Sequence, residues 1–523
     1  MRDPRKGVPL SGGGGMDRLS WQLPSVLRWV VGFLAGIFIL CALAIAITRS
    51  AWPAELEWME GGSLAQVQRL QTGQELYTAP TVEFTPFLYT PLYFEIAAWL
   101  PVNPSSPFLP MRVLSTVAWL ISLGLIAQLV FRRTASGWWS VVGAGLYAAC
   151  FELGGAWFDL ARVDSLALMF LLAAWLALEP RSDGQATPWW SHLLGALFCL
   201  AAFLTKQSAL VVLLPMVLYT LLFGRGLRRW LFPGLSLVGL SLLVVWLNHV
   251  SSGWFNYYVF ELPAGHGIEL SALAGFWRFD LVGPLPILAL AVCFLAVQWL
   301  YARRDRELVW LLALALGFVG SAWLGRLHSG GYLNVLLPAF AFLAVWGVRS
   351  LHLLLEPAFD DPWTAFRVLP SEGSENLRHS LVLLACLLQL ALLVYDPTDH
   401  IPRQADLQAT RKLQSWIAAQ PGEVWVPAHA WLASTAGKPT AAHEMALLDV
   451  LRGPQGDARR SLERALKRDL ENGRWSAVIL DRPWLEEFLQ PGYRPGPPPY
   501  DTPDLGWPLT GMRTRPQEIW LRK

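Results

Sequence analysis

The feature that most constrains this 523-residue chain is a long succession of apolar stretches, many of them close to the length of a membrane-spanning helix. A helix needs about 20 predominantly apolar residues to cross the hydrocarbon core of a bilayer. By that rule the sequence predicts about eleven spans, near residues 26–47, 109–130, 138–155, 165–179, 190–204, 208–223, 231–247, 281–301, 308–323, 333–348 and 380–395. The predicted fold class is therefore an all-α polytopic membrane protein.

The composition agrees with a membrane location. The chain is 54% hydrophobic and only 15% charged, whereas soluble domains carry about 25% charged residues. The net charge is +2 and the sequence shows no basic patch interleaved with aromatics, which argues against nucleic acid as a partner. Many of the 28 tryptophans lie near the ends of apolar stretches, as in an interfacial aromatic belt. The five cysteines lie inside apolar stretches at no metal-ligand spacing, so we expect buried small hydrophobes.

The distribution of arginines predicts the orientation in the membrane. The first apolar stretch, 26–47, is too long for a cleaved signal peptide and is predicted to stay as a signal anchor, whether translation starts at Met1 or Met16. Among residues 26–395, alternate turns hold most of the arginines, namely Arg132, Arg133, Arg181, Arg225, Arg228, Arg229, Arg303, Arg304 and Arg306, together with those of the segment 349–379. Since cytoplasmic loops carry the excess of Lys and Arg, we expect a cytoplasmic N-terminus and an extracytoplasmic C-terminus in the inner (plasma) membrane.

Three parts follow from this topology. Residues 1–25 are predicted to form a cytoplasmic tail, and residues 26–395 a transmembrane domain that includes a first outer loop at 49–108. Residues 396–523 are charged and proline-rich, with strand-like runs at 423–426 and 476–480 and helical patterns at 405–419 and 458–472. That alternation predicts a small extracytoplasmic α/β domain.

The first outer loop carries a cluster of acids next to the membrane. Glu55, Glu57 and Glu60 precede a polar helical pattern that Gly73 ends, and Tyr89 opens an amphipathic segment, 89–101, suited to the interface. A glycosyl transfer needs a carboxylate base to take the proton from the acceptor hydroxyl. A solvated acidic loop is the alternative interpretation.

Later outer turns add further polar residues. Charges at a membrane boundary are costly unless they are solvated, paired or used. In the turn that contains Asp159 and Asp164, Arg162 either pairs with one of these acids or holds a phosphate. Lys206, followed by Gln207, either snorkels at a helix end or supplies a point charge for a phosphate.

A fourth outer turn combines Arg326, His328 and Asn334 with a glycine pair that permits close backbone approach. The Arg326 guanidinium either binds an anion through two parallel N–H donors, or extends from a helix end to keep its charge in water. His266, His443 and Glu444 also lie on the outer side; they contact substrate or are surface residues. Cations and acids thus converge on one rim of a helical bundle, where a lipid-linked phosphate-sugar would present its head group.

These outer segments resemble a known superfamily. The stretch with Glu60-Gly-Gly, Gly73, Tyr77 and Thr90-Pro91-Leu92-Tyr93 is similar to the first outer loop of GT-C glycosyltransferases. More narrowly, it resembles the bacterial family 39-like, protein-mannosyltransferase and aminoarabinose-transferase group, described as RgtA/B/C/D-like. Segments 158–169, 203–215 and 326–338 resemble that group's later outer turns, and the similarity covers about residues 27–350.

The resemblance implies an inverting EC 2.4 enzyme that moves a hexosyl or pentosyl group from a polyprenyl-phosphate donor to a lipid, glycan or protein acceptor. Glu60 matches the acidic first-loop position, and Asp164 with Arg162 matches the second outer loop. Many members have an Asp-Glu pair where this chain has Met59 and Glu60, so the base is Glu60 or Glu57. Tyr89, Asp159, Lys206, Gln207, Arg326, His328 and Asn334 are expected to bind substrate. The family implies no obligatory metal; a divalent ion is possible, but no ligand cluster supports it.

Two other functions remain as alternatives. A flippase for lipid-linked glycans needs polar residues threaded through the middles of the spans, whereas here they concentrate at one surface. A non-catalytic scaffold or polymer ligase fits less well, because the long acid-bearing loop follows the first span instead of lying late in the bundle.

Overall fold

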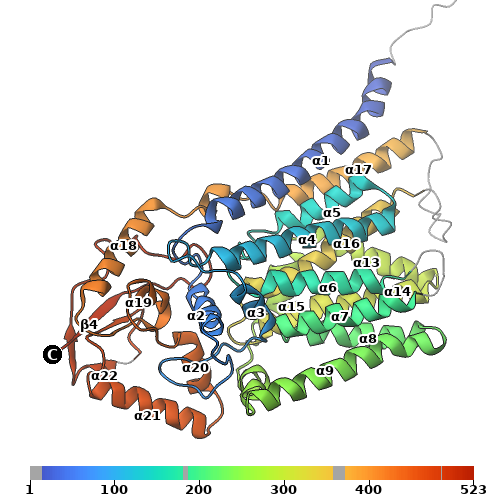
Figure 1. The fold of residues 1–523 in the computed structure, drawn as a ribbon. Helices are drawn as coiled ribbons and strands as arrows, with labels where there is room; N and C mark the ends of the chain where they lie inside the picture. The colour runs from blue at the N-terminus through green and yellow to red at the C-terminus, as the bar shows by residue number, and fades with distance from the viewer. Residues whose placement is uncertain (1–13, 181–186, 357–371, 485) are drawn as a thin grey trace, which may run out of the picture.

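The computed structural model describes residues 14–180, 187–356, 372–484 and 486–523. A bundle of helices fills one part of the molecule, and a smaller domain with a β-sheet lies at one end of it (Figure 1). Residues 1–13 of the predicted tail, Arg181, and residues 357–371 of the predicted cytoplasmic segment lie outside the described residues.

Every predicted span contains a helix, although the helix of the span 138–155, α5, ends at Ala149. The main helices of the bundle are α1 (Gly14–Ser50), α4 (Leu109–Thr134), α5 (Gly137–Ala149), α6 (Asp164–Leu178), α7 (Trp189–Thr205), α8 (Ala209–Phe223), α9 (Leu231–Val250), α13 (Pro286–Tyr301), α14 (Asp305–Leu314), α15 (Gly320–Leu327), α16 (Leu337–Leu353) and α17 (Glu372–Ala391). Shorter helical segments connect them: η1 (Gly226–Trp230), α10 (Trp254–Asn256), η2 (Tyr257–Glu261), α11 (Leu262–Ala264), α12 (Ala272–Gly275), η3 (Phe276–Val282), η4 (Ala315–Val319) and η5 (Leu333–Leu336).

Length and composition identify fewer spans than the sequence suggests. Within the described residues, five helices are long and apolar enough to cross a membrane, or six if a pair bent by 101° at residues 283–285 counts as one span. Helices α6, α7 and α8 are apolar but have only 15 to 17 residues. The all-helical membrane fold is thus confirmed, and the number of about eleven spans stays a prediction.

The bundle packs around α16, which is buried along most of its length and contacts α4, α5 and α13. At the end away from the sheet, the buried Glu179 carboxylate accepts hydrogen bonds from the indoles of Trp175 and Trp310 and pairs with Arg133. The buried Glu179 carboxylate is tolerated inside the bundle because its oxygens have these partners. By contrast, α9 leaves an apolar face exposed, as expected of a helix that faces lipid.

The first loop, residues 51–108, connects α1 to α4 and contains α2 (Glu60–Gln71) and α3 (Leu92–Ala98). Helix α2 lies between the bundle and the sheet domain (Figure 1). The glycine pair after Glu60 permits this packing, because a Cβ on Gly61 would lie 2.2 Å from Glu55 Oε1 and one on Gly62 would lie 2.1 Å from the Phe87 ring. Gly73, predicted to end the helix, has φ 73° just beyond it.

The domain after η7 (Pro397–His400) is a small α/β unit. Its sheet has the order β1-β2-β4-β3, with β1 parallel to β2 and β4 antiparallel to both β2 and β3. The elements are α18 (Gln404–Ala419), β1 (Val424–Trp425), η8 (Pro427–His429), α19 (Trp431–Thr435), α20 (Glu444–Arg452), α21 (Asp457–Glu471), β2 (Ala477–Leu480), α22 (Glu486–Leu489), β3 (Tyr493–Pro495) and β4 (Glu518–Arg522). The sequence predicts α18, α21, β1 and β2 closely and misses β3 and β4.

All five cysteines are free thiols. Cys150, Cys199 and Cys386 are buried as predicted, whereas Cys293 is exposed on α13, which corrects the expectation for that residue. An exposed apolar helix face suits contact with lipid as well as contact with protein.

Candidate active site

Glu57 lies at the junction of the first loop, the bundle and the sheet domain. Its side chain is 1% exposed, and its Oε2 lies 3.1 Å from Arg162 Nη1. Burial raises the pKa of Glu57 to about 7, against the opposing charge of Arg162. A carboxyl with that pKa is ionised for half of the time near neutral pH, the condition in which a general base is most effective.

Glu60 has a different environment, although it is only three residues away. One oxygen accepts hydrogen bonds from Arg112 Nε at 3.0 Å and from the Ala161 amide at 2.8 Å. The other accepts from Arg112 Nη2 at 2.5 Å and from the Leu56 amide at 2.8 Å. Burial by itself would raise the pKa of Glu60, but these partners, with Arg112 foremost, hold it below its ordinary value. Glu60 therefore joins the first loop to α4 and to the turn before α6.

Arg162 is the cation nearest to Glu57. Its Nη2 donates to the Tyr89 hydroxyl at 2.8 Å, and its guanidinium lies 5.5 Å from the ring centres of both Tyr89 and Trp157. Its Nε is buried and has no hydrogen-bond partner within the described part of the chain. The prediction that Arg162 pairs with Asp159 or Asp164 is wrong for direct contact: its ion pair is with Glu57.

Asp164 gathers the other polar residues of this end of the bundle. Its Oδ2 accepts from Trp157 Nε1 at 2.9 Å. Its Oδ1 accepts from Lys206 Nζ at 2.6 Å and from Asn334 Nδ2 at 2.9 Å. Three turns that are far apart in the sequence thus meet at one carboxylate, as their predicted position on one rim requires.

The segment that carries Tyr89 is anchored on the same end of the bundle. Gln207 Nε2 donates to the Leu88 carbonyl at 2.8 Å, and Thr90 Oγ1 donates to the Phe203 carbonyl at 2.7 Å. Gln207 therefore holds the first loop against α7, and its buried Oε1 has no partner in the described ranges.

Three predicted substrate-binding residues lie in other interactions. Asp159 forms a buried ion pair with Arg49, whose Nε lies 2.5 Å from Asp159 Oδ2. Arg326 pairs with Asp280 at 2.8 Å and donates to the Gly331 carbonyl at 2.7 Å. His328 contacts the Pro263 carbonyl at 3.3 Å, and its ring lies tilted by 46° against the ring of His266, with ring centres 4.8 Å apart. The structure therefore does not bring these residues into the Asp164 cluster.

His443 and Glu444 are internal, which corrects the alternative that they are surface residues. His443 is 2% exposed; its Nε2 lies 3.1 Å from the Trp58 carbonyl, and its Nδ1 accepts from the Met445 amide at 3.1 Å. Glu444 pairs with Arg482 at 2.5 Å. His443 thus belongs to the contact between the sheet domain and the first loop, whereas the Glu444 pair lies within the sheet domain.

Sequence reasoning missed several residues that organise this region: Arg49, Arg112, Trp157, His429 and Asp481. Arg49 and Arg112 lie at the ends of apolar stretches, where a snorkelling side chain is the ordinary interpretation. A signal was present nonetheless, because each is a single arginine on the side of the membrane where cations are scarce.

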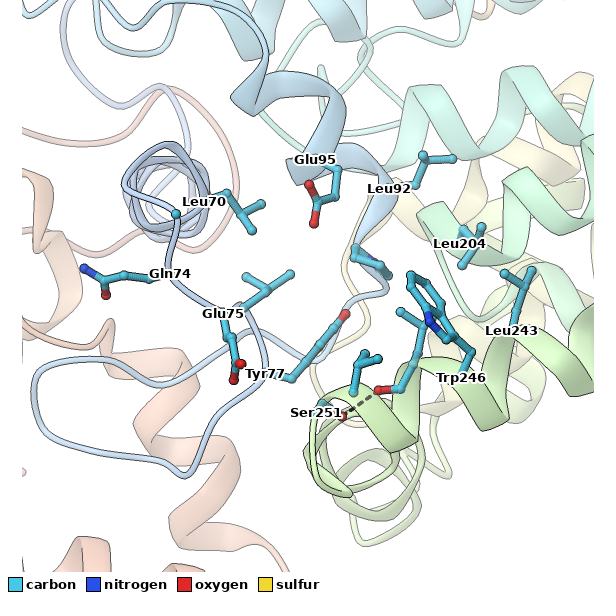
Figure 2. Close-up of a pocket in the computed structure, with 15 residues that line it drawn as sticks. Leu70, Gln74, Glu75, Tyr77, Leu92, Glu95, Leu204, Leu243, Trp246 and Ser251 are labelled. Atoms are coloured by element: carbon cyan, nitrogen blue, oxygen red, sulfur yellow. Dashed lines mark hydrogen bonds between the residues drawn. The ribbon is translucent and has the colours of Figure 1, made fainter.

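An apolar groove of about 620 Å³ lies beside the cluster, between the first loop and the ends of α7 and α9. Figure 2 shows Leu204, Leu243 and Trp246 along one side of it, and Leu70, Leu92 and Glu95 along another. It reaches Pro91, two residues after Tyr89, and Leu204, two residues before Lys206. The volume and the mostly apolar lining of this groove suit a hydrocarbon chain that lies near the polar cluster.

Among the residues that the structure describes, no group of three His, Cys, Asp or Glu side chains is arranged to hold a metal ion.

The sequence and the fold are similar to those of membrane glycosyltransferases. Residues 97–251 match the family model of dolichyl-phosphate-mannose-protein mannosyltransferases. No curated protein matches the sequence. The crystal structure of ArnT from Cupriavidus metallidurans bound to undecaprenyl phosphate has the same fold, with TM-score 0.53 at 13% identity over 94% of this chain and 97% of that one.

The archaeal oligosaccharyltransferase AglB from Archaeoglobus fulgidus, in complex with an inhibitory peptide and a dolichol-phosphate, matches with TM-score 0.50 at 11% identity. That match covers 86% of this chain and 69% of AglB. The chain is thus an integral membrane protein with the GT-C fold. The match of residues 97–251 to the mannosyltransferase family model and the shared fold both agree with the resemblance that the sequence predicts.

Proposed function

We propose that this enzyme transfers a sugar from a polyprenyl-phosphate donor to a hydroxyl group of a lipid, glycan or protein acceptor, with Glu57 as general base and with inversion at the anomeric carbon. The observation that carries the proposal is the buried Glu57–Arg162 pair, which lies next to the Asp164–Lys206 pair at one end of the bundle. A base and cations for a leaving phosphate are the two requirements of this displacement.

The donor class is supported by the cluster and the groove together. Arg162 has a buried N–H without a partner among the described residues, and Lys206 is the second cation at this end of the bundle. Both are suited to the phosphate of a lipid-linked sugar. The isoprenoid chain would lie in the groove, which is lined by Pro91 and Leu204, two residues away from Tyr89 and Lys206 respectively. ArnT binds undecaprenyl phosphate and AglB binds a dolichol-phosphate, so a polyprenyl phosphate is the donor class that fits the shared fold.

The reaction is a single displacement. The acceptor oxygen attacks the anomeric carbon while Glu57 takes the hydroxyl proton, and the bond from that carbon to the phosphate oxygen breaks with its electron pair leaving on the polyprenyl phosphate. Arg162 and Lys206 would stabilise the negative charge that develops on this leaving group. Attack from the side opposite to the phosphate gives inversion.

Glu57 is the better base of the two predicted acids. Both oxygens of Glu60 are held by Arg112 and by backbone amides, and its pKa is lowered, so it accepts a proton poorly. Glu57 is buried next to a single cation and has a pKa of about 7. A proton is therefore taken up more readily at Glu57.

We place the reaction on the extracytoplasmic side of the plasma membrane. The active-site residues lie at the end of the bundle that contacts the sheet domain, and the arginine-rich turns at Arg133, Arg228 and Arg306 belong to the other end. Positive-inside topology puts those turns in the cytoplasm.

The test uses the full chain in lipid nanodiscs with undecaprenyl phosphate bearing radiolabelled hexoses or pentoses, and a cell-envelope extract as the source of acceptor. The expected result is release of undecaprenyl phosphate that depends on the extract. Glu57→Gln should lower this rate by about 10²–10⁴-fold, the usual contribution of a general base. Full activity of Glu57→Gln, or movement of the labelled lipid across the bilayer without cleavage of the glycosidic bond, would overturn the proposal.

A further inference from the structure

The contact between the sheet domain and the first loop contains a histidine held between two carboxylates. His429 Nδ1 lies 2.5 Å from Glu55 Oε2, and His429 Nε2 lies 3.0 Å from Asp481 Oδ2. All three side chains are buried, with exposed fractions of 7%, 5% and 1% for His429, Glu55 and Asp481. A ring nitrogen that faces a carboxylate must donate a proton to it, so the contact with two ionised acids requires the protonated imidazolium.

The Glu55 end of this bridge continues into the helix next to the proposed base. Glu55 Oε1 accepts a hydrogen bond from the Gly61 amide at 2.9 Å, in the first turn of α2. Glu57 lies between these two points of attachment in the sequence. The backbone of residues 55–61 is thus held at both ends around Glu57, and His429 fixes one of these ends from another domain.

The Asp481 end continues into a second contact with the same loop. Asp481 Oδ2 also accepts from Thr514 Oγ1 at 2.6 Å. Thr514 belongs to residues 505–515, which we name the strap. The strap donates to the Leu56 carbonyl from the amides of Leu509 at 2.9 Å and Thr510 at 3.1 Å.

The strap reaches the proposed base itself. A Cβ on Gly511 would lie 2.6 Å from Glu57 Cγ, so the strap covers this side chain closely. Thr510 Oγ1 donates to the Gly155 carbonyl of the bundle at 2.5 Å. His429, Asp481 and Thr514 therefore join the two segments that enclose Glu57.

We propose that His429 is a positioning residue of the transfer reaction: its protonated ring clamps the sheet domain onto the first loop and thereby holds Glu57 against Arg162. The inference rests on the proposed function, because it takes Glu57 as the base. It assigns to the sheet domain a role in completing the active site.

The charges around His429 determine when the clamp is closed. The first loop contributes Glu55 and, further away, Glu60 with its partner Arg112; β2 and the segment after it contribute Asp481 and Arg482. The remaining groups that face the cluster are His443 and Glu444 at the start of α20 and Tyr500 in the segment before the strap.

Burial by itself would lower the pKa of His429, but Asp481 and Glu55 raise it well above its ordinary value. A raised histidine pKa gives a stabilisation that is complete below the unfolded pKa, about 6.5, and is lost as pH rises through the folded one. Burial also raises the pKa of Glu55, to about 7, against the charge of His429. The His429 shift therefore predicts a contact that weakens on the alkaline side, whereas any change from Glu55 is complete once pH has risen from its ordinary pKa to about 7.

The clamp is tested by hydrogen–deuterium exchange of the full chain in nanodiscs, followed by mass spectrometry of peptides that cover residues 54–71. We expect these peptides to exchange at least tenfold faster in His429→Gln than in the wild type. In the wild type, exchange corrected for its intrinsic pH dependence should accelerate at alkaline pH. Lys412→Gln, which breaks an exposed pair with Asp501 in the same domain, should exchange like the wild type.

A second measurement separates positioning from general stability. His429→Lys keeps a cation between the two acids, so it should protect residues 54–71 better than His429→Gln and move the alkaline loss to higher pH. If His429→Gln does not fold, the pH dependence of the wild-type peptides decides. Wild-type protection that is unchanged through the alkaline range, or equal exchange in His429→Gln and wild type, would overturn the clamp.

Activity distinguishes this inference from the proposed function. With radiolabelled undecaprenyl-phosphate sugars and envelope extract, His429→Gln should lower kcat about tenfold and leave KM for the donor within twofold, because the residue does not contact the donor site. An inactive Glu57→Gln together with a His429→Gln of wild-type kcat and pH profile would refute the clamp alone. A fully active Glu57→Gln would refute the proposed function, whereas the exchange result would still stand.

Discussion

Glu57 and Glu60 lie in the same loop, both fully buried and each facing an arginine, yet their surroundings differ in completeness. Glu60 has four donors from Arg112 and the backbone, which use both of its oxygens. Glu57 faces Arg162, whose Nε remains without a partner in the described structure. A buried ion pair whose donors and acceptors all have hydrogen-bond partners serves as a structural connection. A buried ion pair with a donor or acceptor left over can bind a substrate group.

The largest effect is expected when the complete pair is broken. Glu60→Gln leaves Arg112 buried without a counter-charge, which costs about 3–5 kcal/mol. The apparent Tm in detergent, followed by tryptophan fluorescence, should fall by several degrees more than in Glu57→Gln. Replacing both residues, by Glu60→Leu with Arg112→Met, should recover part of the loss. An equal Tm for the two single variants would remove the distinction between the acids.

The next largest effect is expected at Arg162, whose buried Nε has no hydrogen-bond partner among the described residues. Arg162→Gln should raise KM for the undecaprenyl-phosphate donor about tenfold or more, because a charge-assisted hydrogen bond contributes about 1.5–3 kcal/mol. Arg326→Gln is the matched control: Arg326 is already paired with Asp280 and the Gly331 carbonyl, so its KM should change by less than threefold. Steady-state kinetics with the labelled donor measure both values, and the reverse order would contradict the position of the phosphate site.

A smaller effect is expected at the strap. Gly511 has φ 80°, and a methyl group there would press on Glu57, so Gly511→Ala should lower kcat about tenfold in addition to a backbone cost of about 1 kcal/mol. Gly437 has φ 75° in the same domain with open space around it, and Gly437→Ala should show the backbone cost without the loss of kcat. Equal kcat in the two variants would show that the strap does not act on Glu57.

The smallest effect is a pH dependence. A base must be deprotonated, so the rate should fall as pH drops and reach half of its plateau at about 7, the pKa of buried Glu57. Arg162→Gln should move this midpoint upward, because Arg162 favours the ionised form. Since Glu55 has a similar pKa, Glu55→Gln is the control: it should keep the acidic limb of the profile. If Glu55→Gln loses the acidic limb, then that limb reports the titration of Glu55 and not that of Glu57.

The sequence predicts the helical spans and the meeting of Arg162, Asp164, Lys206 and Asn334, because apolar length and loop charge depend on local composition. It also predicts α18, α21, β1 and β2. It does not predict β3 and β4, which have three and five residues and no clear alternation.

The sequence alone does not predict which charged residues form ion pairs with one another, and the reason is physical. Asp159 and Arg162 are close in the chain, yet Asp159 pairs with Arg49 and Arg162 pairs with Glu57, each more than 100 residues away. Packing of helices, not proximity in sequence, decides which charges share a buried site. The contact of His429 with Glu55 joins residues 374 positions apart and has no local signature.

The strand order β1-β2-β4-β3 has a consequence for biogenesis. Strand β4 is synthesised after the other three, yet it lies between β2 and β3, so the sheet cannot close while the ribosome is still translating the residues before it. The strap precedes β4 directly and reaches Glu57 from there. Under the proposed function, a chain whose membrane helices have already inserted would consequently remain inactive until translation has passed the last strand.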